Sequence, residues 1–312
     1  MGQTRIQPPR FQAEGEIIYS VFGDRGRLTR ERHMIYNKRF LVAREDQQWK
    51  IRTSSLNDGI EYEEAGCDGL RFFELRQMNE DKIRRERGGL SPNGYTTSGW
   101  VRYGKFPVGM DSNLVFPLWL AFCSTDYFHH HREGRIVSPE FQQGAMLFQK
   151  AAPAFHARSA TWQLNGSFLP GKIEWRPEGK EYGYPPPFDG EFLSASFEIL
   201  QWGEFLGLQL PTNFELKTFF PNNFQLHPDP TQGELCPSWI IEGEAHCFHD
   251  LSDFSCWPVL TKKAIITDGR FRGGCCPDGW LSYGSSTWMT EDEVEAKNQQ
   301  HGIKCEKQIP QD

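Results

Sequence analysis

The sequence lacks an apolar run long enough to cross a membrane as a helix. Its longest apolar stretch, residues 114–123, falls short of the roughly 18 residues that a spanning helix needs, and Pro117 interrupts it. The opening residues, MGQTRI, lack the apolar core of a signal peptide, and Ile6 stands where the myristoylation pattern needs Ser or Thr. We therefore expect no transmembrane segment and no export signal in the chain as given.

Several signatures of catalysis are missing too. The sequence holds no Gly-x-Ser-x-Gly elbow, no complete glycine-rich phosphate loop and no Cys-x-x-Cys pair. The net charge of −7 and the sequence pI of about 5.8 argue against a nucleic-acid partner engaged by overall charge. The sequence thus predicts no catalytic residue, no cofactor and no nucleic-acid partner.

Aromatic residues, in contrast, are abundant. They make up 14% of the 312 residues, with 24 Phe and 10 Trp. Large aromatic side chains suit half-buried pleated surfaces, so this composition favours strands over helices. Two interpretations stay open: a large, fully packed aromatic core, or an aromatic-lined cavity for an apolar ligand.

Strand patterns run through most of the chain. Residues 49–53 alternate apolar and polar side chains, and the tripeptide Cys67-Asp68-Gly69 between apolar segments is typical of a hairpin turn. Further strands are expected over residues 11–22, 28–45, 60–65, 70–75, 95–103, 161–164, 172–175, 238–246 and 264–270.

The longest strand pattern covers residues 191–220. Its expected breaks lie at Gly203 and at Pro211-Thr212, and another break is expected at Asn37-Lys38 in an earlier strand. Alternation within the long pattern predicts one inward face. The side chains expected to face inward are Phe192, Ala195, Phe197, Ile199, Leu206, Leu208 and Leu210.

Three segments predict helices. Ser112 is placed to cap the first, with Pro117 in its first turn. The second is expected over residues 139–150. The third, over residues 290–298, opens on Thr290 with a Glu three residues on, which fits a capping box.

The order of strands, helices and strands predicts a mainly antiparallel β fold with a few helices, of the α+β class. We expect a curved half-barrel sheet plugged by a central helical insert. The expected organisation is an N-terminal extension over residues 1–10, a single curved-sheet domain over residues 11–270 with the insert at about 112–150, and a C-terminal loop and short helix over residues 271–312.

Cysteines gather toward the end of the chain, with six of the eight after residue 235. An even number in a loop-rich region is typical of disulfides and an oxidising compartment, whereas thiols near histidines also suit zinc. Unpaired thiols are the remaining alternative. A vicinal bridge needs a strained peptide, so Cys275 and Cys276 would bond to separate partners. The disulfide candidates are Cys236, Cys247, Cys256, Cys275, Cys276 and Cys305.

Histidines provide the candidate metal ligands. His129, His130 and His131 are adjacent, and a strand would turn neighbours to opposite sides, so a polar surface turn is the alternative. His246 and His249 lie in the cysteine-rich region, whose spacing matches no established zinc motif. The sequence therefore predicts no metal site and leaves these five histidines as candidates.

The layout also resembles that of a known family. The opening strand Phe11-Gln12-Ala13-Glu14-Gly15 leads into long hairpins, Cys67-Asp68-Gly69 precedes Phe72-Phe73, a helical insert follows, and late strands include LGLQLPTNFEL at residues 206–216. Over about residues 11–270 this arrangement resembles the LolA/LolB-like half-barrel proteins of bacterial envelopes, in which helices plug a curved antiparallel sheet. The resemblance implies an envelope setting and an apolar cavity that holds lipid.

Three functions stand as hypotheses. The first is a non-enzymatic envelope protein that binds a lipid or another apolar ligand in a half-barrel cavity. The second is a fully packed scaffold or interaction protein without a ligand. The third is a metal-dependent hydrolase that uses His129–His131 or the cysteine-histidine cluster. We expect the cell envelope or secretion, with the cytoplasm as the alternative. The ligand-binding residues and any protein partner are not evident from the sequence.

Overall fold

The computed structural model of the chain contains two compact units. The first unit comprises Met1–Arg10, Ala43–Phe106 and Leu251–Asp312, and the second comprises Phe11–Val42 and Pro107–Asp250. The structure describes residues 10–24, 27–56, 61–79, 96–104, 114–125, 160–164, 169–176, 178–182, 186–221, 235–251, 253–273 and 280–308.

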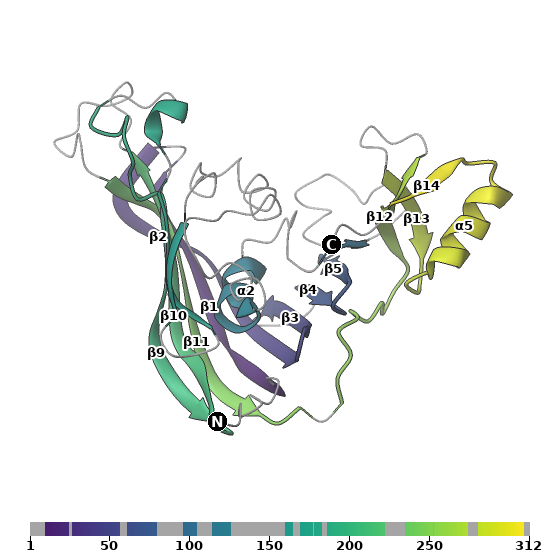
Figure 1. Cartoon of the computed structure of the whole chain (residues 1–312), viewed down its shortest axis with the longest axis horizontal. Helices are drawn as coiled ribbons and strands as arrows, with labels where there is room; N and C mark the ends of the chain where they lie inside the picture. The colour runs from purple at the N-terminus through teal and green to yellow at the C-terminus, as the bar shows by residue number, and fades with distance from the viewer. Residues whose placement is uncertain are drawn as a thin grey trace, which may run out of the picture. The chain divides into compact units, whose positions relative to one another are not determined.

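The second unit is built on a long-stranded sheet. Its strands are β1 (Arg10–Asp24), β2 (Arg27–Glu45), β7 (Ala160–Leu164), β8 (Pro170–Trp175), β9 (Ala195–Phe205), β10 (Leu208–Pro221) and β11 (Leu235–His249). Their order is β2-β1-β11-β10-β9-β8-β7, and the registers from β1 to β7 along this order are all antiparallel. The long strands bend along their length beside the helix α2 (Val115–Phe122) (Figure 1).

The first unit has shorter strands. They are β3 (Gln48–Ser55), β4 (Tyr62–Cys67), β5 (Arg71–Gln77), β6 (Thr97–Tyr103), β12 (Ala264–Gly273), β13 (Trp280–Ser285) and β14 (Cys305–Lys307). The strands β3 to β6 form an antiparallel meander, and β6 then pairs with β12 in parallel. Both β13 and β14 pair with β12, and the helix α5 (Glu291–Gln300) lies beside them (Figure 1).

The predicted fold class is confirmed: the sheets are mainly antiparallel and open, with few helices, and a helical insert packs on a curved sheet. The hairpin at Cys67-Asp68-Gly69 is confirmed as well, since Asp68 Oδ1 accepts hydrogen bonds from two following backbone N–H groups and Gly69 has φ +89°. Thr290 is the N-cap of α5 and forms the full capping box with Glu293. A short 3-10 helix at Gly179–Tyr182 completes the described helices.

Three local predictions were wrong. The strand β2 runs unbroken through Asn37-Lys38, because pairing in the sheet overrides the turn preference of Asn. The turn of the long β segment lies at Leu206-Gly207, where both residues have positive φ. Leu206 is therefore 70% exposed and does not face inward. Pro211 instead lies within β10 at a register shift, a place where a strand tolerates proline.

The first helix also differs from its prediction in its N-cap, which is Leu114 and not Ser112, although Pro117 does lie in the first turn. The helix predicted over residues 139–150 lies outside the described residues. Within the described part of the chain, no helix has the length and apolar character to span a membrane.

The contacts divide the chain differently from the predicted single domain over residues 11–270, because residues 43–106 group with the C-terminal part. The cause is the parallel pairing of β6 with β12, which joins segments far apart in the sequence. A grouping of contacts is not a test of independent folding, so the predicted domain boundaries stay a prediction.

Candidate functional site

An aromatic surface covers one face of the second-unit sheet. Every second side chain of β1 from Phe11 to Tyr19 is buried, because successive side chains of a strand point to opposite faces. The register continues this face across β11 and β10, where Ile17 pairs with Gly243 and Gly243 with Phe214. We call this the inner face and its opposite the outer face. The inner face carries Phe11, Tyr19, Phe40, Phe197, Phe214 and Trp239.

The helix α2 covers one part of the inner face. The ring centre of Phe122 lies 6.2 Å from that of Phe11, 6.0 Å from that of Phe40 and 5.9 Å from that of Phe214. All four rings are at most 3% exposed. Tilted and edge-on ring pairs of this kind stabilise a core by about 0.5–1.5 kcal/mol each beyond area burial. Phe122 therefore fills the space directly against this part of the sheet.

The sequence of α2 explains why it needs cover on every side. Its eight residues, VFPLWLAF, include no polar side chain, and all are buried. No side chain caps its N-terminus at Leu114. Its C-terminal end is closed by the Cys123 N–H, which donates to the Trp119 carbonyl at 2.8 Å, and by Ser124 Oγ, which donates to the Leu120 carbonyl at 2.7 Å. Apolar contact, and not capping at its start, holds α2 in place.

Further along β2 the inner face becomes exposed. Tyr36 lies four residues from Phe40, so the two side chains share a face, yet Tyr36 is 45% exposed. The Tyr36 ring stacks on Tyr19 at 5.7 Å with an interplanar angle of 16°, and Trp239 meets Tyr19 edge-on at 6.0 Å. Lys38 Nζ lies 5.6 Å from the centre of the Tyr36 ring. We call Tyr19, Tyr36, Lys38 and Trp239 the aromatic ledge.

The aromatic ledge can make two kinds of contact at once. Its exposed ring, Tyr36, offers an apolar surface for a hydrocarbon chain or ring and is backed by the buried rings of Tyr19 and Trp239. The ammonium group of Lys38 stands over the exposed ring and can pair with a carboxylate or phosphate while its own stem covers apolar surface. This combination suits an amphiphilic molecule better than a purely apolar one.

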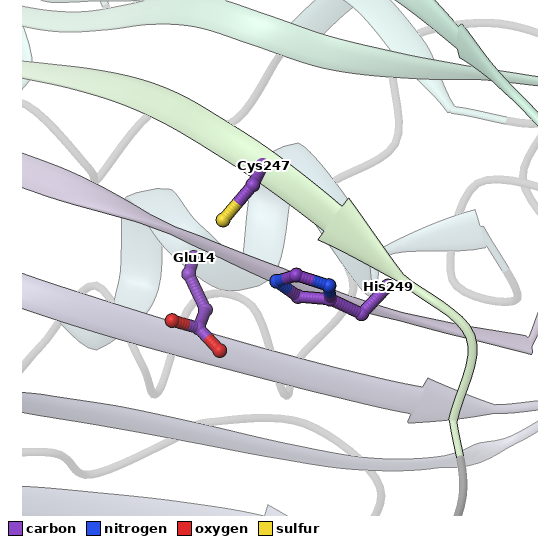
Figure 2. A group of neighbouring side chains, drawn as sticks. All are labelled: Glu14, Cys247 and His249. Atoms are coloured by element: carbon purple, nitrogen blue, oxygen red, sulfur yellow. The ribbon is translucent and has the colours of Figure 1, made fainter.

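On the outer face, two strands bring together three potential metal ligands (Figure 2). Glu14 comes from β1, and Cys247 and His249 come from β11, with one ligand atom of each residue within 4.8 Å of the others. Cys247 and His249 were candidates from the sequence, whereas Glu14 was not. Gln12 Nε2 donates a hydrogen bond to Glu14 Oε1 at 2.7 Å. This arrangement gives the outer face the chemistry of a cation site.

The other sequence candidates are not brought together among the described residues. His246 is exposed on β11 and lies outside the group of three. Cys247, Cys256 and Cys305 are free thiols, so the predicted disulfides find no support there. Cys247 instead lies beside Glu14 and His249, and Cys305 Sγ accepts a hydrogen bond from an Asn amide. The side chains of His129, His130, His131, Cys236, Cys275 and Cys276 lie outside the description.

The thiol of Cys256 has low reactivity. Burial raises its pKa to about 11, and the nearby Asp68 carboxylate adds to the rise. Since the thiolate is the reactive form, this side chain is a poor nucleophile at neutral pH. The Cys256 backbone packs against Gly66, where an added Cβ would lie 2.0 Å from the Cys256 carbonyl oxygen. Its role is therefore structural.

Comparison with known proteins gives fold similarity only. No protein-family model matches the sequence, and no curated protein matches it. A LolA superfamily protein from Nitrosomonas europaea is 8% identical, with 80% of this chain and 90% of that chain covered and a TM-score of 0.34. A DUF1329 family protein from Desulfovibrio piger is also 8% identical, with 79% and 88% covered and a TM-score of 0.26.

Both TM-scores are below 0.5, so these similarities carry no argument about this chain. Neither similarity is close enough to transfer a ligand, a partner or a location to this chain. The functional argument therefore depends on the residues of the inner and outer faces.

Sequence reasoning missed Tyr36 and Glu14. The spacing of Tyr36 from Phe40 was a usable signal, because residues four apart in a strand share a face. The exposure of Tyr36 was not evident from the sequence, because tertiary packing and not residue type determines it. Glu14 carried no signal, because its neighbours in space are more than two hundred residues away in the chain.

Proposed function

We propose that the protein binds an apolar or amphiphilic small molecule, such as a fatty acid, on the inner face of the second unit. The observation that carries this proposal is the change of exposure along one face of β2. Phe40 is 3% exposed beside α2, and Tyr36 on the same face is 45% exposed. An exposed aromatic surface continuous with an apolar core is a place where a ligand gains stability by being buried.

The ledge also fixes the orientation of such a ligand. Its hydrocarbon part would lie on the rings of Tyr36 and Tyr19, toward the apolar side chains near α2. Its anionic group would point to Lys38, whose ammonium lies over the Tyr36 ring. Of the two ligand kinds, this geometry favours a molecule with one apolar end and one negative end.

The helix α2 would act as a displaceable cover in this scheme. Among the described residues, its ring contacts with the sheet include those of Phe122 with Phe11, Phe40 and Phe214. A hydrocarbon chain offers Phe11, Phe40 and Phe214 the same dispersion contacts as that ring does. If the hydrocarbon chain of the ligand replaced the Phe122 ring in these contacts, the ligand could extend from the ledge to the space beneath α2.

Displacement of a fluorescent fatty acid tests the proposal. The unchanged protein should bind the probe saturably, and Tyr36→Ser should weaken binding by about tenfold, because loss of roughly 1.4 kcal/mol of apolar contact changes Kd tenfold. Leu200→Ser is the matched control: Leu200 is 59% exposed on β9, and its neighbour Ile199 is buried on the inner face, so Leu200 points outward. This control should bind as the unchanged protein does.

Two results would contradict the proposal. One is the absence of saturable binding by the unchanged protein. The other is equal weakening by Tyr36→Ser and Leu200→Ser, which would indicate general loss of structure. The first result would favour a packed interaction protein, because Phe122 already fills the space against Phe11, Phe40 and Phe214. The envelope location stays a prediction from the sequence, as does the absence of an enzymatic activity.

A further inference from the structure

We propose that Glu14, Cys247 and His249 bind a Zn²⁺ ion on the outer face of the second-unit sheet (Figure 2). This site is separate from the proposed ligand surface, because it lies on the opposite face. The three side chains offer a carboxylate, a thiolate and an imidazole, the three ligand types that zinc uses in proteins.

A β-bulge creates this combination of side chains. Glu14 pairs with Cys247 while the next residue, Gly15, pairs with Ala245, so His246 is an extra residue in β11. Without that extra residue the alternation of β11 would turn Cys247 and His249 to the inner face. The bulge therefore re-aims both side chains to the outer face beside Glu14, as bulges near functional sites often do.

Gly15 makes the bulge possible. A Cβ at this position would lie 1.9 Å from the Glu244 carbonyl oxygen and 2.8 Å from the Ala245 Cα. Only glycine lets the backbones of β1 and β11 approach so closely. A glycine inside a strand is intrinsically unfavourable. Here it lies at the position where the bulge aligns the three ligands.

The geometry of the cluster fits a zinc ion. The three ligand atoms lie within 4.8 Å of one another. Bond lengths of about 2.0–2.3 Å in a tetrahedral site place ligand atoms roughly 3.5 Å apart. Glu14 and Cys247 are partly buried and His249 is exposed, so small side-chain rotations can close the difference without moving the strands.

The surroundings favour a cation. Gln12, which pairs with His249 across the ladder, donates its amide to Glu14 Oε1 and so orients the carboxylate. Such supporting hydrogen bonds are typical of zinc ligands. Two more carboxylates, Glu16 and Glu244, face each other one step along the same ladder and add negative charge. Three protein ligands leave the fourth coordination position for water, as in zinc sites that act on bound molecules.

A Co²⁺ titration of the chelator-treated full chain tests the site. Co²⁺ takes the place of Zn²⁺, and a thiolate ligand gives it a near-ultraviolet charge-transfer band. We expect the band to saturate at one ion per chain and to vanish when Zn²⁺ is added. Cys247→Ser should abolish the band. His249→Gln and Glu14→Gln should each lower the Co²⁺ affinity by at least about 10–100-fold. That is the loss typical of removing a side chain that only supports a metal ligand, and removal of a ligand itself should cost no less.

Two control variants separate the site from other histidines and thiols. His301→Gln removes an exposed histidine of the first unit, and Cys305→Ser removes a half-buried free thiol of the same unit. Both should leave Co²⁺ affinity and the band unchanged. Gly15→Ala keeps all three ligands but disturbs the bulge, so it should weaken binding while circular dichroism reports whether the sheet remains folded.

The proposal is overturned if the unchanged protein gives no thiolate band, or if the band survives Cys247→Ser. It is also overturned if Glu14→Gln binds Co²⁺ as tightly as the unchanged protein. Tyr36→Ser should not alter Co²⁺ binding, since that side chain belongs to the inner face. Failure of the zinc site and failure of the ligand proposal are therefore distinguishable.

Discussion

The interiors of the two units differ in kind. Among the described residues, every buried charged side chain belongs to the first unit, and the buried polar side chains of the second unit are hydroxyls. The buried charged residues are Arg44, Glu64, Glu74, Asp268 and Arg270. The buried hydroxyl residues of the second unit are Ser20, Ser124, Thr125, Ser194 and Thr218.

This difference indicates different tasks. A buried charge must find its partner in one geometry, so the charged interior of the first unit specifies a single packing. Asp268 and Arg270 illustrate this, because two side-chain hydrogen bonds of 2.7 and 3.0 Å join them, the Arg270 backbone N–H donates to Asp268 Oδ1 at 3.0 Å, and Tyr283 Oη donates to the same carboxylate at 3.0 Å. Among the described residues, the interior of the second unit has no buried charged pair of this kind, which suits a surface that exchanges one apolar contact for another.

The largest expected effect is on the buried pair of the first unit. Asp268→Ala leaves the Arg270 guanidinium, at 0% exposure, beside the Met289 carbonyl and the Phe271 ring without its carboxylate partner. Removal of one partner of a buried pair costs about 3–5 kcal/mol, so urea unfolding should show a loss of that size. The double change Asp268→Leu with Arg270→Met should restore most of it, because apolar residues of similar volume need no partner.

An exposed pair in the second unit is the matched control. The side chains of Arg32 and Glu242 form an ion pair and are 45% and 40% exposed. Glu242→Ala should cost less than about 1 kcal/mol, because water screens exposed pairs. Equal losses for Asp268→Ala and Glu242→Ala would contradict the comparison between the two interiors.

The second expected effect is on the apolar interior. A Cβ at Gly243 would lie 2.1 Å from Cζ of Phe214, so Gly243→Ala should cost about 1–3 kcal/mol in free energy of unfolding through overpacking. Adding Phe214→Leu should recover part of this loss by removing the ring. Gly190→Ala is the control, since nothing lies within 4 Å of the added Cβ. A loss at Gly243 that Phe214→Leu does not reduce would indicate a backbone cause.

The third effect concerns the two helices. Thr290 Oγ1 accepts the Glu293 N–H at 3.3 Å, and Glu293 Oε2 accepts the Thr290 N–H at 2.7 Å. Thr290→Ala should therefore lower the free energy of unfolding by about 1 kcal/mol, and Thr290→Ser should not. The helix α2 has no such cap and depends on burial. No difference between the Ala and Ser variants would mean that α5 also depends on packing alone.

The capping box, the hairpin at Cys67-Asp68-Gly69 and the inward set around Phe197 could all be predicted from the sequence. Each depends on residues that are close along the chain, so local spacing was enough. The turn at Leu206-Gly207 was predicted in the wrong place because proline usually ends a strand. The register shift beside Pro211 shows how β10 accommodates this proline.

The candidate sites were harder to predict from the sequence. The parallel pairing of β6 with β12 and the bulge at His246 depend on partners far along the chain, which periodicity does not identify. Cys247 and His249 could be named as ligands by residue type, but Glu14 becomes a partner only through that bulge. The aromatic ledge depends on the stacking of Tyr36 on Tyr19 across two strands, which residue types do not reveal.

The smallest expected effect concerns a partly exposed carboxylate of the first unit, Glu291, whose contribution to stability can be compared with that of the buried Asp268. Burial opposes the ionised form of Glu291, but hydrogen bonds from Lys307 and Tyr103 outweigh it and lower its pKa below the ordinary value. In the unfolded chain this carboxyl binds a proton at higher pH than in the folded one. Stability from Glu291 is therefore present above its unfolded pKa of about 4.3 and is lost as pH falls through the lower folded value.

Glu291→Gln should remove this contribution. Urea unfolding between pH 7 and pH 3 should show a shallower acid-side loss for the variant, with a difference below about 1 kcal/mol at neutral pH because the pair is partly exposed. Glu306→Gln on the neighbouring strand β14 removes the same charge without these partners and should leave the pH profile close to that of the unchanged protein. If Glu291→Gln instead cost as much as Asp268→Ala, the first unit would depend on its surface charges as strongly as on its buried ones.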